Sequence, residues 1–149
     1  MRRIVPIFLV LAAIGFALSL GVHLVTSVGV LWIVGDFLGP LHVGVFIVGA
    51  PAMILSNRLT KGHPRKDYWN IALRGCPRWM RRGASIIFGY CWLRMIVFLF
   101  LSVNQPKPHG AITAGQLAFF SSGWLAFYAM EFVTLYSFGR IQEDNSRHV

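Results

Sequence analysis

The sequence predicts an all-α membrane protein with four transmembrane helices, in which residues 1–149 form a single transmembrane domain. Three observations support this fold class. Hydrophobic residues make up 56% of the 149-residue chain, and its mean hydropathy is +0.61. Charged residues make up 13%, about half of the share that is usual in soluble domains. The apolar residues also form long blocks, and a block of about 20 residues is long enough to cross a bilayer.

The first predicted span covers residues 4–30 and follows Arg2 and Arg3. A basic start before an apolar run also resembles a secretory signal peptide, whose apolar region usually has about 7–15 residues. Here the apolar run is longer and has no clear small-residue cleavage site. We therefore expect the first helix to be retained in the membrane.

The other predicted spans cover residues 41–59, 85–103 and 115–138. The second begins after Pro40 and contains Pro51, which makes it the shortest and most irregular. Irregular backbone at membrane depth must be covered by protein, because lipid offers no hydrogen bonds to it. The spans leave a long loop over residues 57–84 and a tail over 139–149.

The basic residues predict which way the chain crosses the membrane. The N-terminus, the 57–84 loop and the tail together hold twelve of the fourteen Lys and Arg residues, whereas the two opposite connections hold only Lys107, and Arg94 lies within a span. Lys and Arg gather in cytoplasmic loops. We therefore expect both termini and the loop in the cytoplasm, with the bacterial inner membrane as the location. The same bias explains the net charge of +9, so we do not expect nucleic acid as a partner.

The 57–84 loop alternates basic and aromatic residues. Pro64 can begin a helix, and Trp69, Leu73 and Cys76 then fall on one face. A helix with apolar and basic faces tends to lie in the headgroup layer, where each base near an anionic leaflet contributes about 1 kcal/mol. We expect this interfacial helix either to anchor the loop at anionic lipids or to dock a partner. The residues concerned are Arg65, Lys66, Trp69, Arg74, Arg78, Trp79, Arg81 and Arg82.

One stretch of the chain resembles a known group of proteins. The pattern is Trp69-x-x-Ala72-Leu73-Arg74-Gly75-Cys76-Pro77-x-Trp79-Met80-Arg81, followed by Phe88-Gly89-Tyr90. It is similar to a segment of small bacterial multi-pass membrane proteins of uncharacterised function. The resemblance covers about residues 65–100. It implies a bacterial membrane protein and supplies no activity.

Arg94 and Glu131 are charged residues that lie deep within the predicted spans. Measured from the span ends nearest the loop and tail, Arg94 is about 13 Å deep and Glu131 about 10 Å deep. Matched depth on consecutive antiparallel helices predicts an intramembrane ion pair, in which losing one partner costs roughly 3–5 kcal/mol. Alternatively, Arg94 extends to the headgroups and leaves Glu131 alone, or Glu131 serves a proton or substrate pathway.

Histidines give a weaker signal. His23 and His42 are expected at similar heights near the outer boundary, where two histidines from two helices can ligate haem b or contribute to a metal site. Their spacing follows no metal-binding motif, so we expect no cofactor and keep haem b as an alternative. Hydrogen bonding near the interface is the simpler role for both.

Small residues at four-residue spacing predict where helices approach closely. Ala13, Ala17 and Gly21 form such a stripe in the first span. A second stripe in the fourth span consists of Ala118, Ser122 and Ala126. The stripes are expected to face each other within one bundle, or one of them to face a second copy in a homo-oligomer.

The sequence offers little catalytic chemistry. It contains no phosphate-binding loop, paired carboxylates, nucleophile with a nearby base, or C-x-x-C motif, and we expect no disulfide between Cys76 and Cys91. We therefore expect a non-catalytic accessory or scaffold subunit that docks through its basic loop. Two alternatives remain open, a small proton-coupled transporter acting as a homo-oligomer through Glu131, and a haem-binding membrane protein.

Overall fold

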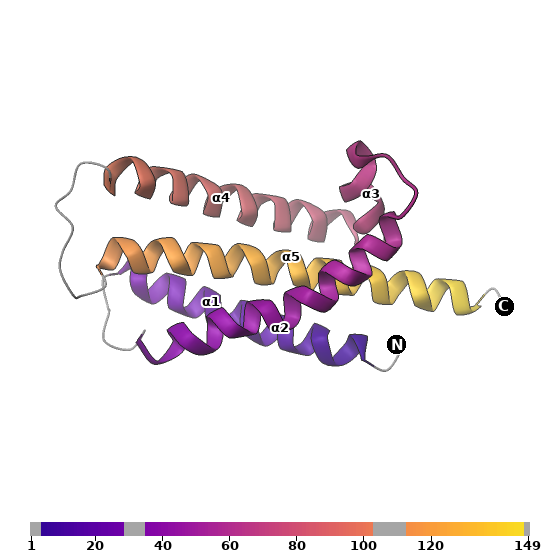
Figure 1. The fold of residues 1–149 in the computed structure, drawn as a ribbon, viewed down its shortest axis with the longest axis horizontal. Coiled ribbons are helices and arrows are strands. Elements are labelled where there is room, and N and C mark those ends of the chain that lie inside the picture. The colour runs from indigo at the N-terminus through magenta and orange to yellow at the C-terminus, as the bar shows by residue number, and fades with distance from the viewer. Residues whose placement is uncertain (1–3, 29–34, 103–112, 148–149) are drawn as a thin grey trace.

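A computed structural model gives the structure of the chain and describes residues 4–28, 35–102 and 113–147. Arg2, Arg3 and Lys107, which the orientation argument uses, lie outside these residues. Four long helices make up most of the described chain (Figure 1): α1 Val5–Ser27, α2 Gly35–Thr60, α4 Arg78–Ser102 and α5 Ala114–Arg147. The short elements η1 Arg65–Asp67 and α3 Tyr68–Ala72 connect α2 to α4.

The predicted fold class is confirmed in its main feature. The described residues are helical with no strand, and four helices are long and apolar enough to cross a membrane. These properties fit a multi-pass membrane protein.

Three helices extend beyond their predicted spans. The second predicted span starts at residue 41, whereas α2 begins at Gly35 and continues through Pro40 and Pro51, so it is not the shortest helix. The third predicted span starts at residue 85, whereas α4 begins at Arg78, directly after Pro77. Proline is well suited to a helix start, and arginine is a good helix former, so the basic residues that follow do not end the helix. Likewise, α5 continues through the predicted tail to Arg147. Arg140 and Glu143 form an ion pair of 3.1 Å there, one turn apart.

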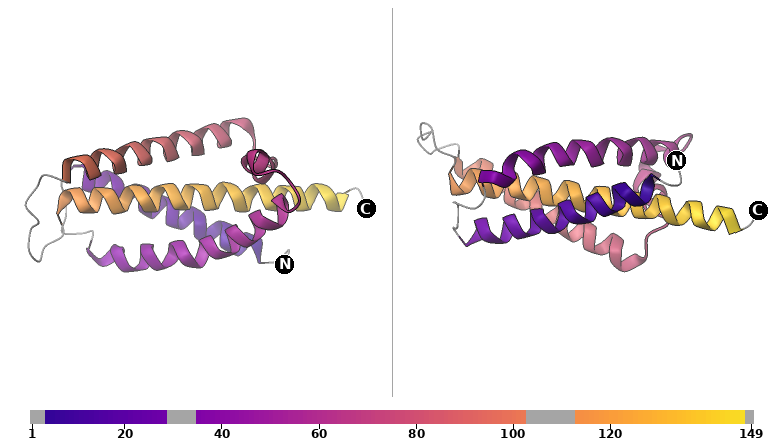
Figure 2. Two further views of the ribbon diagram at one scale, coloured as in Figure 1. Left: turned by 45° about the horizontal axis from the view of Figure 1, so that its top comes forward. Right: turned by 90° about the horizontal axis from the view of Figure 1, so that it is seen from below.

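The helix α5 is the centre of the fold. Figure 1 and the left panel of Figure 2 show it running through the middle, with α4 on one side and α1 and α2 on the other. The helices α1, α2 and α4 each pack against α5, and α1 also packs against α2. In the described residues, the backbone of α4 packs against neither α1 nor α2.

Tyr128 of α5 joins the three helices on one side of the fold. Its ring occupies space beside Gly15 of α1, and its hydroxyl lies beside Gly44 of α2, so that a side chain at either glycine would collide with it. The hydroxyl donates a hydrogen bond of 3.1 Å to the carbonyl of Leu41. This bond also ties α2 to α5 close to the helix start, where Pro40 lies.

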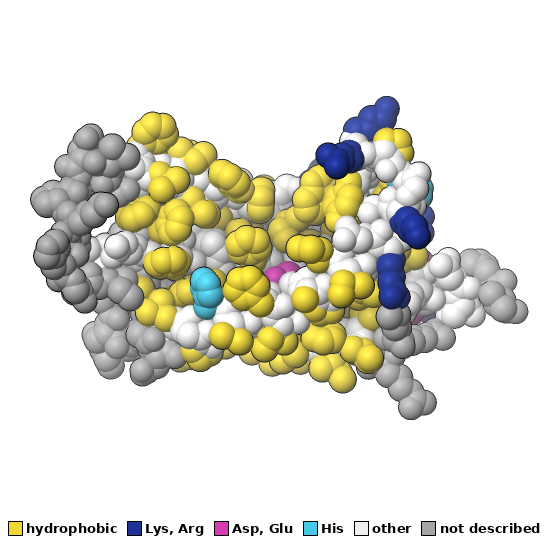
Figure 3. Space-filling model, viewed as in Figure 1, with side chains coloured by type: hydrophobic (Ala, Val, Ile, Leu, Met, Phe, Trp, Pro, Cys, Tyr) yellow, Lys and Arg dark blue, Asp and Glu magenta, His cyan; other side chains and the backbone are white. Residues whose placement is uncertain are grey.

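The start of α1, the connection between α2 and α4, and the end of α5 all lie at the same end of the molecule (Figure 1). We call it the basic end, because the exposed Lys and Arg side chains of the connection gather there, in dark blue in Figure 3.

Candidate functional site: a folded basic end and a carboxyl group in a lateral groove

The connection over residues 61–77, which we call the basic segment, is folded against the helices. Leu73 and Cys76 are buried and pack with Val133 of α5. Three hydrogen bonds fix the segment: Tyr68 hydroxyl with Ser56 hydroxyl at 2.9 Å, the Gly75 amide to Ser137 Oγ at 3.0 Å, and Cys76 Sγ to the Val133 carbonyl at 3.1 Å. The segment is therefore a fixed part of the fold.

Gly75 is required at the point of closest approach. A Cβ atom there would collide with the backbone carbonyl of Ser137, and backbone cannot move aside as a flexible side chain can. The thiol of the adjacent Cys76 lies in the same contact between the basic segment and α5. Burial raises the pKa of this thiol above the ordinary value of 9.0, and its hydrogen bonds with Ser137 and the charge of Arg81 oppose part of that rise.

The expected face with Trp69, Leu73 and Cys76 on one side of a helix does not form. The helix α3 ends at Ala72, so Leu73 and Cys76 lie in the turn that follows it. These two side chains point into the protein, whereas Trp69 is 56% exposed. The turn at Gly75 redirects the chain, and this breaks the helical spacing on which the expectation depends.

Most of the remaining residues of the predicted docking surface are exposed. Trp79 is 72% exposed, and Arg81 is half-buried. An open depression of about 580 Å³ lies where the basic segment meets α4, lined by Asn70, Arg78, Arg81, Arg82, Ser85 and Ile86. Among the residues of this predicted surface, the exposed basic side chains are Arg65, Lys66, Arg74, Arg78 and Arg82.

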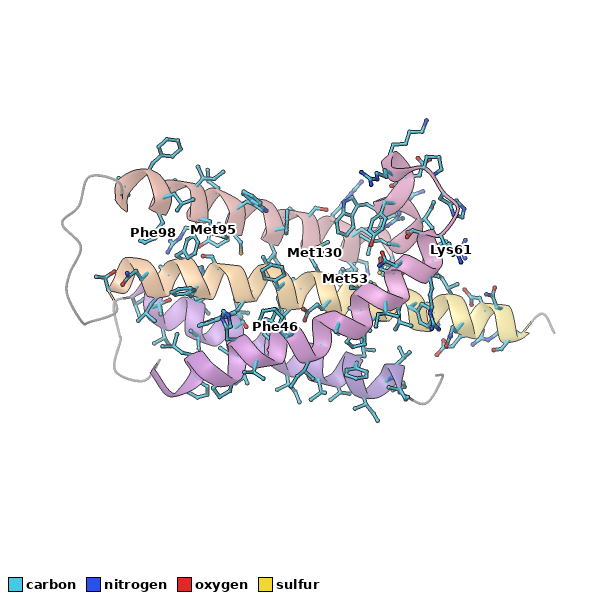
Figure 4. The ribbon with its side chains drawn as sticks, in the orientation of Figure 1. Phe46, Met53, Lys61, Met95, Phe98 and Met130 are labelled. Carbon is cyan, nitrogen blue, oxygen red and sulfur yellow. The ribbon has the colours of Figure 1, made fainter. Side chains whose placement is uncertain are left out.

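A second candidate site is a lateral groove between α2 and α4, with α5 as its floor. Its volume is about 460 Å³, and its lining is almost entirely apolar. Figure 4 shows Phe46 and Met53 on α2 and Met95 on α4 around the space between these helices. The lining residues are His42, Val45, Phe46, Gly49, Ala50, Met53, Met95, Phe119, Phe120, Gly123, Trp124, Phe127 and Glu131.

Glu131 supplies the acidic group in the lateral groove. The residue is 7% exposed, and its Oε1 atom occupies the space where Gly49 has no side chain. The other oxygen, Oε2, is buried and has no hydrogen-bond partner. Acidic atoms are visible in a hollow between hydrophobic side chains in Figure 3. An unpartnered carboxyl group within a spanning helix commonly marks a functional site.

The structure does not bring Arg94 and Glu131 together. Among the described residues the ion pair within 4.0 Å is Arg140–Glu143. Cys91 packs with Leu125 and Ala126, and in this antiparallel register Glu131 lies about 12 Å along the axis from Arg94. The depths expected from the sequence were measured from span ends that α4 and α5 both exceed.

His23 is the centre of a polar cluster inside the bundle. Its Nδ1 atom lies 3.0 Å from the Ser121 hydroxyl, and its Nε2 atom lies 3.0 Å from the Tyr90 hydroxyl. Thr26 lies 3.4 Å from the same Ser121 hydroxyl. Arg94 is close enough to act electrostatically on His23. The cluster therefore links α1, α4 and α5 through polar side chains.

His42 belongs to a different set of contacts, since its Nδ1 accepts a hydrogen bond of 3.3 Å from the Trp124 indole. Both histidines thus have hydrogen-bond partners, as the sequence suggested. The described residues contain no group of three or more His, Cys, Asp or Glu side chains arranged to hold a metal ion. Cys76 and Cys91 are both free and buried.

The two small-residue stripes do not face each other. Ala13, Ala17 and Gly21 are exposed on α1. On α5, Ser122 and Ala126 are buried and Ala118 is half-buried. The face that α1 buries instead contains Gly15, Ser19 and His23 at the same four-residue spacing. This second run of small and polar residues marks the face of α1 that packs in the bundle, and the sequence prediction chose the other run.

Comparison of the chain with protein-family models, with curated proteins and with solved structures gave no match.

Proposed function

We propose that the protein is a non-catalytic accessory or scaffold subunit of the bacterial inner membrane, and that its basic end docks an acidic surface of a cytoplasmic partner. The observation that carries this proposal is the folded basic segment. Leu73, Gly75 and Cys76 fix it against α5, so its outward basic side chains are presented from defined positions. Fixed charges lose less conformational entropy on binding than a flexible loop would.

The proposed orientation places the basic end in the cytoplasm. It is supported by the positive-inside bias, together with the common position of the α1 start, the basic segment and the α5 end (Figure 1). Single cysteines at Asn70 and Asn145 test it, because the native cysteines are buried. Both new thiols should react with a membrane-impermeant maleimide only when the cytoplasmic side is open. Reaction of the two from opposite sides would refute the topology.

Docking is tested by purification in mild detergent followed by mass spectrometry. The double variant Arg74→Glu/Arg82→Glu reverses one exposed charge of the basic segment and one that lines the depression, and Arg140→Glu/Arg147→Glu makes the same change in charge on α5. We expect the partner to be lost only from the first variant. Equal retention by both, or equal loss from both, would contradict docking at the basic segment.

A second candidate function is a proton-coupled transporter, and the buried Oε2 of Glu131 in the lateral groove favours it. In this function a carboxyl group that gains and loses a proton couples to a substrate in the same groove. Glu131→Gln should then abolish uptake by reconstituted vesicles, while the variant keeps the thermal stability of the unmodified protein. Unchanged uptake would exclude this role.

A further inference from the structure

We propose that the lateral groove binds a membrane-soluble amine, a molecule with a single apolar chain and one protonated nitrogen that is held at Glu131. This binding site goes beyond the docking function above and does not depend on it. Three properties of the groove carry the inference: its shape, its lining and its unpartnered carboxyl group.

The shape of the groove favours a narrow, elongated occupant. The floor runs along α5 from Phe119 to Glu131, about 18 Å at the helical rise per residue. A volume of about 460 Å³ is spread along this length, with lining residues from α2, α4 and α5. The groove therefore fits a narrow, elongated molecule. Its volume is within the range of about 300–1,000 Å³ that is typical of small-molecule sites.

The lining selects an apolar body. Aromatic rings lie on one side and on the floor of the groove, with Phe46 on α2 and Phe120, Trp124 and Phe127 on α5. Phe120 and Trp124 are stacked, with ring centroids 6.2 Å apart. Such faces pack well against an alkyl chain, and they also attract a cation through the ring quadrupole.

The carboxyl group selects the end group. Glu131 is more than nine-tenths buried, lines the groove, and leaves Oε2 without a partner. The described residues place no cationic side chain in the groove lining. A protonated amine in the groove can donate a hydrogen bond to this carboxyl group and pair with its negative charge, whereas an acyl chain or an alcohol carries no charge to pair with it.

The experiment uses the full chain in nanodiscs of neutral phosphatidylcholine and dodecylamine with a diazirine near the far end of its chain. Dodecanol with the same diazirine is the uncharged control. After irradiation, mass spectrometry locates the labelled residues, and competition with unlabelled dodecylamine gives the affinity. We expect saturable labelling toward the His42 and Phe119 end of the groove, and no saturable labelling by the alcohol.

Two pairs of variants identify the groups responsible. Glu131→Gln keeps the shape of the side chain and should weaken binding roughly tenfold or more, whereas Glu143→Gln on the exposed tail should not. Gly123→Leu should fill the groove and block binding, because a side chain there meets open space. Gly89→Leu is its control, since Gly89 also faces open space but lies outside the groove.

Three results would overturn the proposal. Equal labelling by amine and alcohol would show that lipid chains fill the groove without selection for charge. Unchanged binding by Glu131→Gln or by Gly123→Leu would place the amine elsewhere. Crosslinks from the groove to a second copy of the chain, with no labelling by the amine, would make the groove an interface between subunits.

Discussion

The helices α4 and α5 lie side by side but have opposite surroundings. In the most apolar 18-residue window of each, 61% of the α5 residues are buried, against 11% for α4. The difference follows from the packing, since the backbone of α5 contacts three long helices, whereas in the described residues α5 is the one long helix that the backbone of α4 contacts. Length and hydropathy qualify both helices to span a membrane, yet only α5 organises the protein.

The comparison indicates that α4 is the separable part of the bundle. It is held by the cluster of Leu73, Cys76, Ala84 and Val133 at the basic end, by Cys91 further along, and by the hydrogen bond between Tyr90 and His23. Two apolar hollows flank it. One is the lateral groove, and the other, of about 220 Å³, lies beside α1 and includes Ala13 and Phe16 in its lining. Movement of α4 would open or close both.

The largest loss of stability is expected from Tyr128→Ala, which should disrupt the packing of α1 and α2 against α5. The change removes the ring that fills the spaces beside Gly15 and Gly44, and truncating a buried aromatic residue typically costs roughly 3–5 kcal/mol. Phe127→Ala is the matched control, because Phe127 is adjacent but 59% exposed. Thermal unfolding in detergent should separate the two variants, and equal losses would show that Tyr128 is not central.

The next effect concerns the attachment of α4 at the basic end. Gly75→Ala places a Cβ against the Ser137 carbonyl, and overpacking of this kind typically costs roughly 1–3 kcal/mol. The segment should lift from α5 and expose Cys76, which a membrane-impermeant maleimide would then label faster. Cys91, buried within α4, is an internal reference. Gly83→Ala is the control, because a Cβ atom at Gly83 would lie in open space, and it should leave the labelling rate of Cys76 unchanged. Faster labelling of Cys76 in the Gly83→Ala variant would contradict the proposed role of Gly75.

A smaller effect is expected where α4 reaches α1 through side chains. Tyr90→Phe removes the hydrogen bond to His23 Nε2, and such bonds within membranes average about 0.6 kcal/mol. A double-mutant cycle with His23→Leu, measured by the free energy of unfolding, should give a coupling of this size. Zero coupling would mean that Tyr90 and His23 do not stabilise each other.

The smallest effect is a dependence on pH at Cys76. Because burial raises the pKa of this thiol in the folded protein, the unfolded chain loses the proton first as the pH rises. The thiol therefore makes its full contribution to the free energy of unfolding when the pH is below its ordinary pKa of 9.0, and the contribution declines as the pH rises above that value. Unfolding measured between about pH 8 and pH 10 should show this decline, and Cys76→Ala should lack it. The same decline in both proteins would assign it to another group.

The sequence predicted features that depend on length and composition. Four apolar blocks gave four helices, and the basic residues marked one end of the bundle. Tertiary contacts decided the rest. The α1 stripe of Ala13, Ala17 and Gly21 and the run of Gly15, Ser19 and His23 have the same spacing. The second run is the buried one, and it contacts Tyr128 and Ser121 of α5.

The candidate site was predicted in part. Glu131 was identified from its ionisable side chain in an apolar helix, and its burial agrees with that reasoning. Its surroundings depend on the register between helices, which apolar patterning does not encode. Arg94 illustrates the limit, because an error of two turns in a helix end changes which residues lie at the same depth.

The continuous helix α5 has a mechanical consequence. Its 34 residues span about 51 Å, longer than a hydrocarbon core of about 30 Å. The helix is therefore longer than such a core, and Figure 1 shows its C-terminal end projecting beyond the other helices. A change of tilt at Glu131 would swing the far tip through a larger arc, so a probe on the final turn would amplify small rearrangements deep in the bilayer.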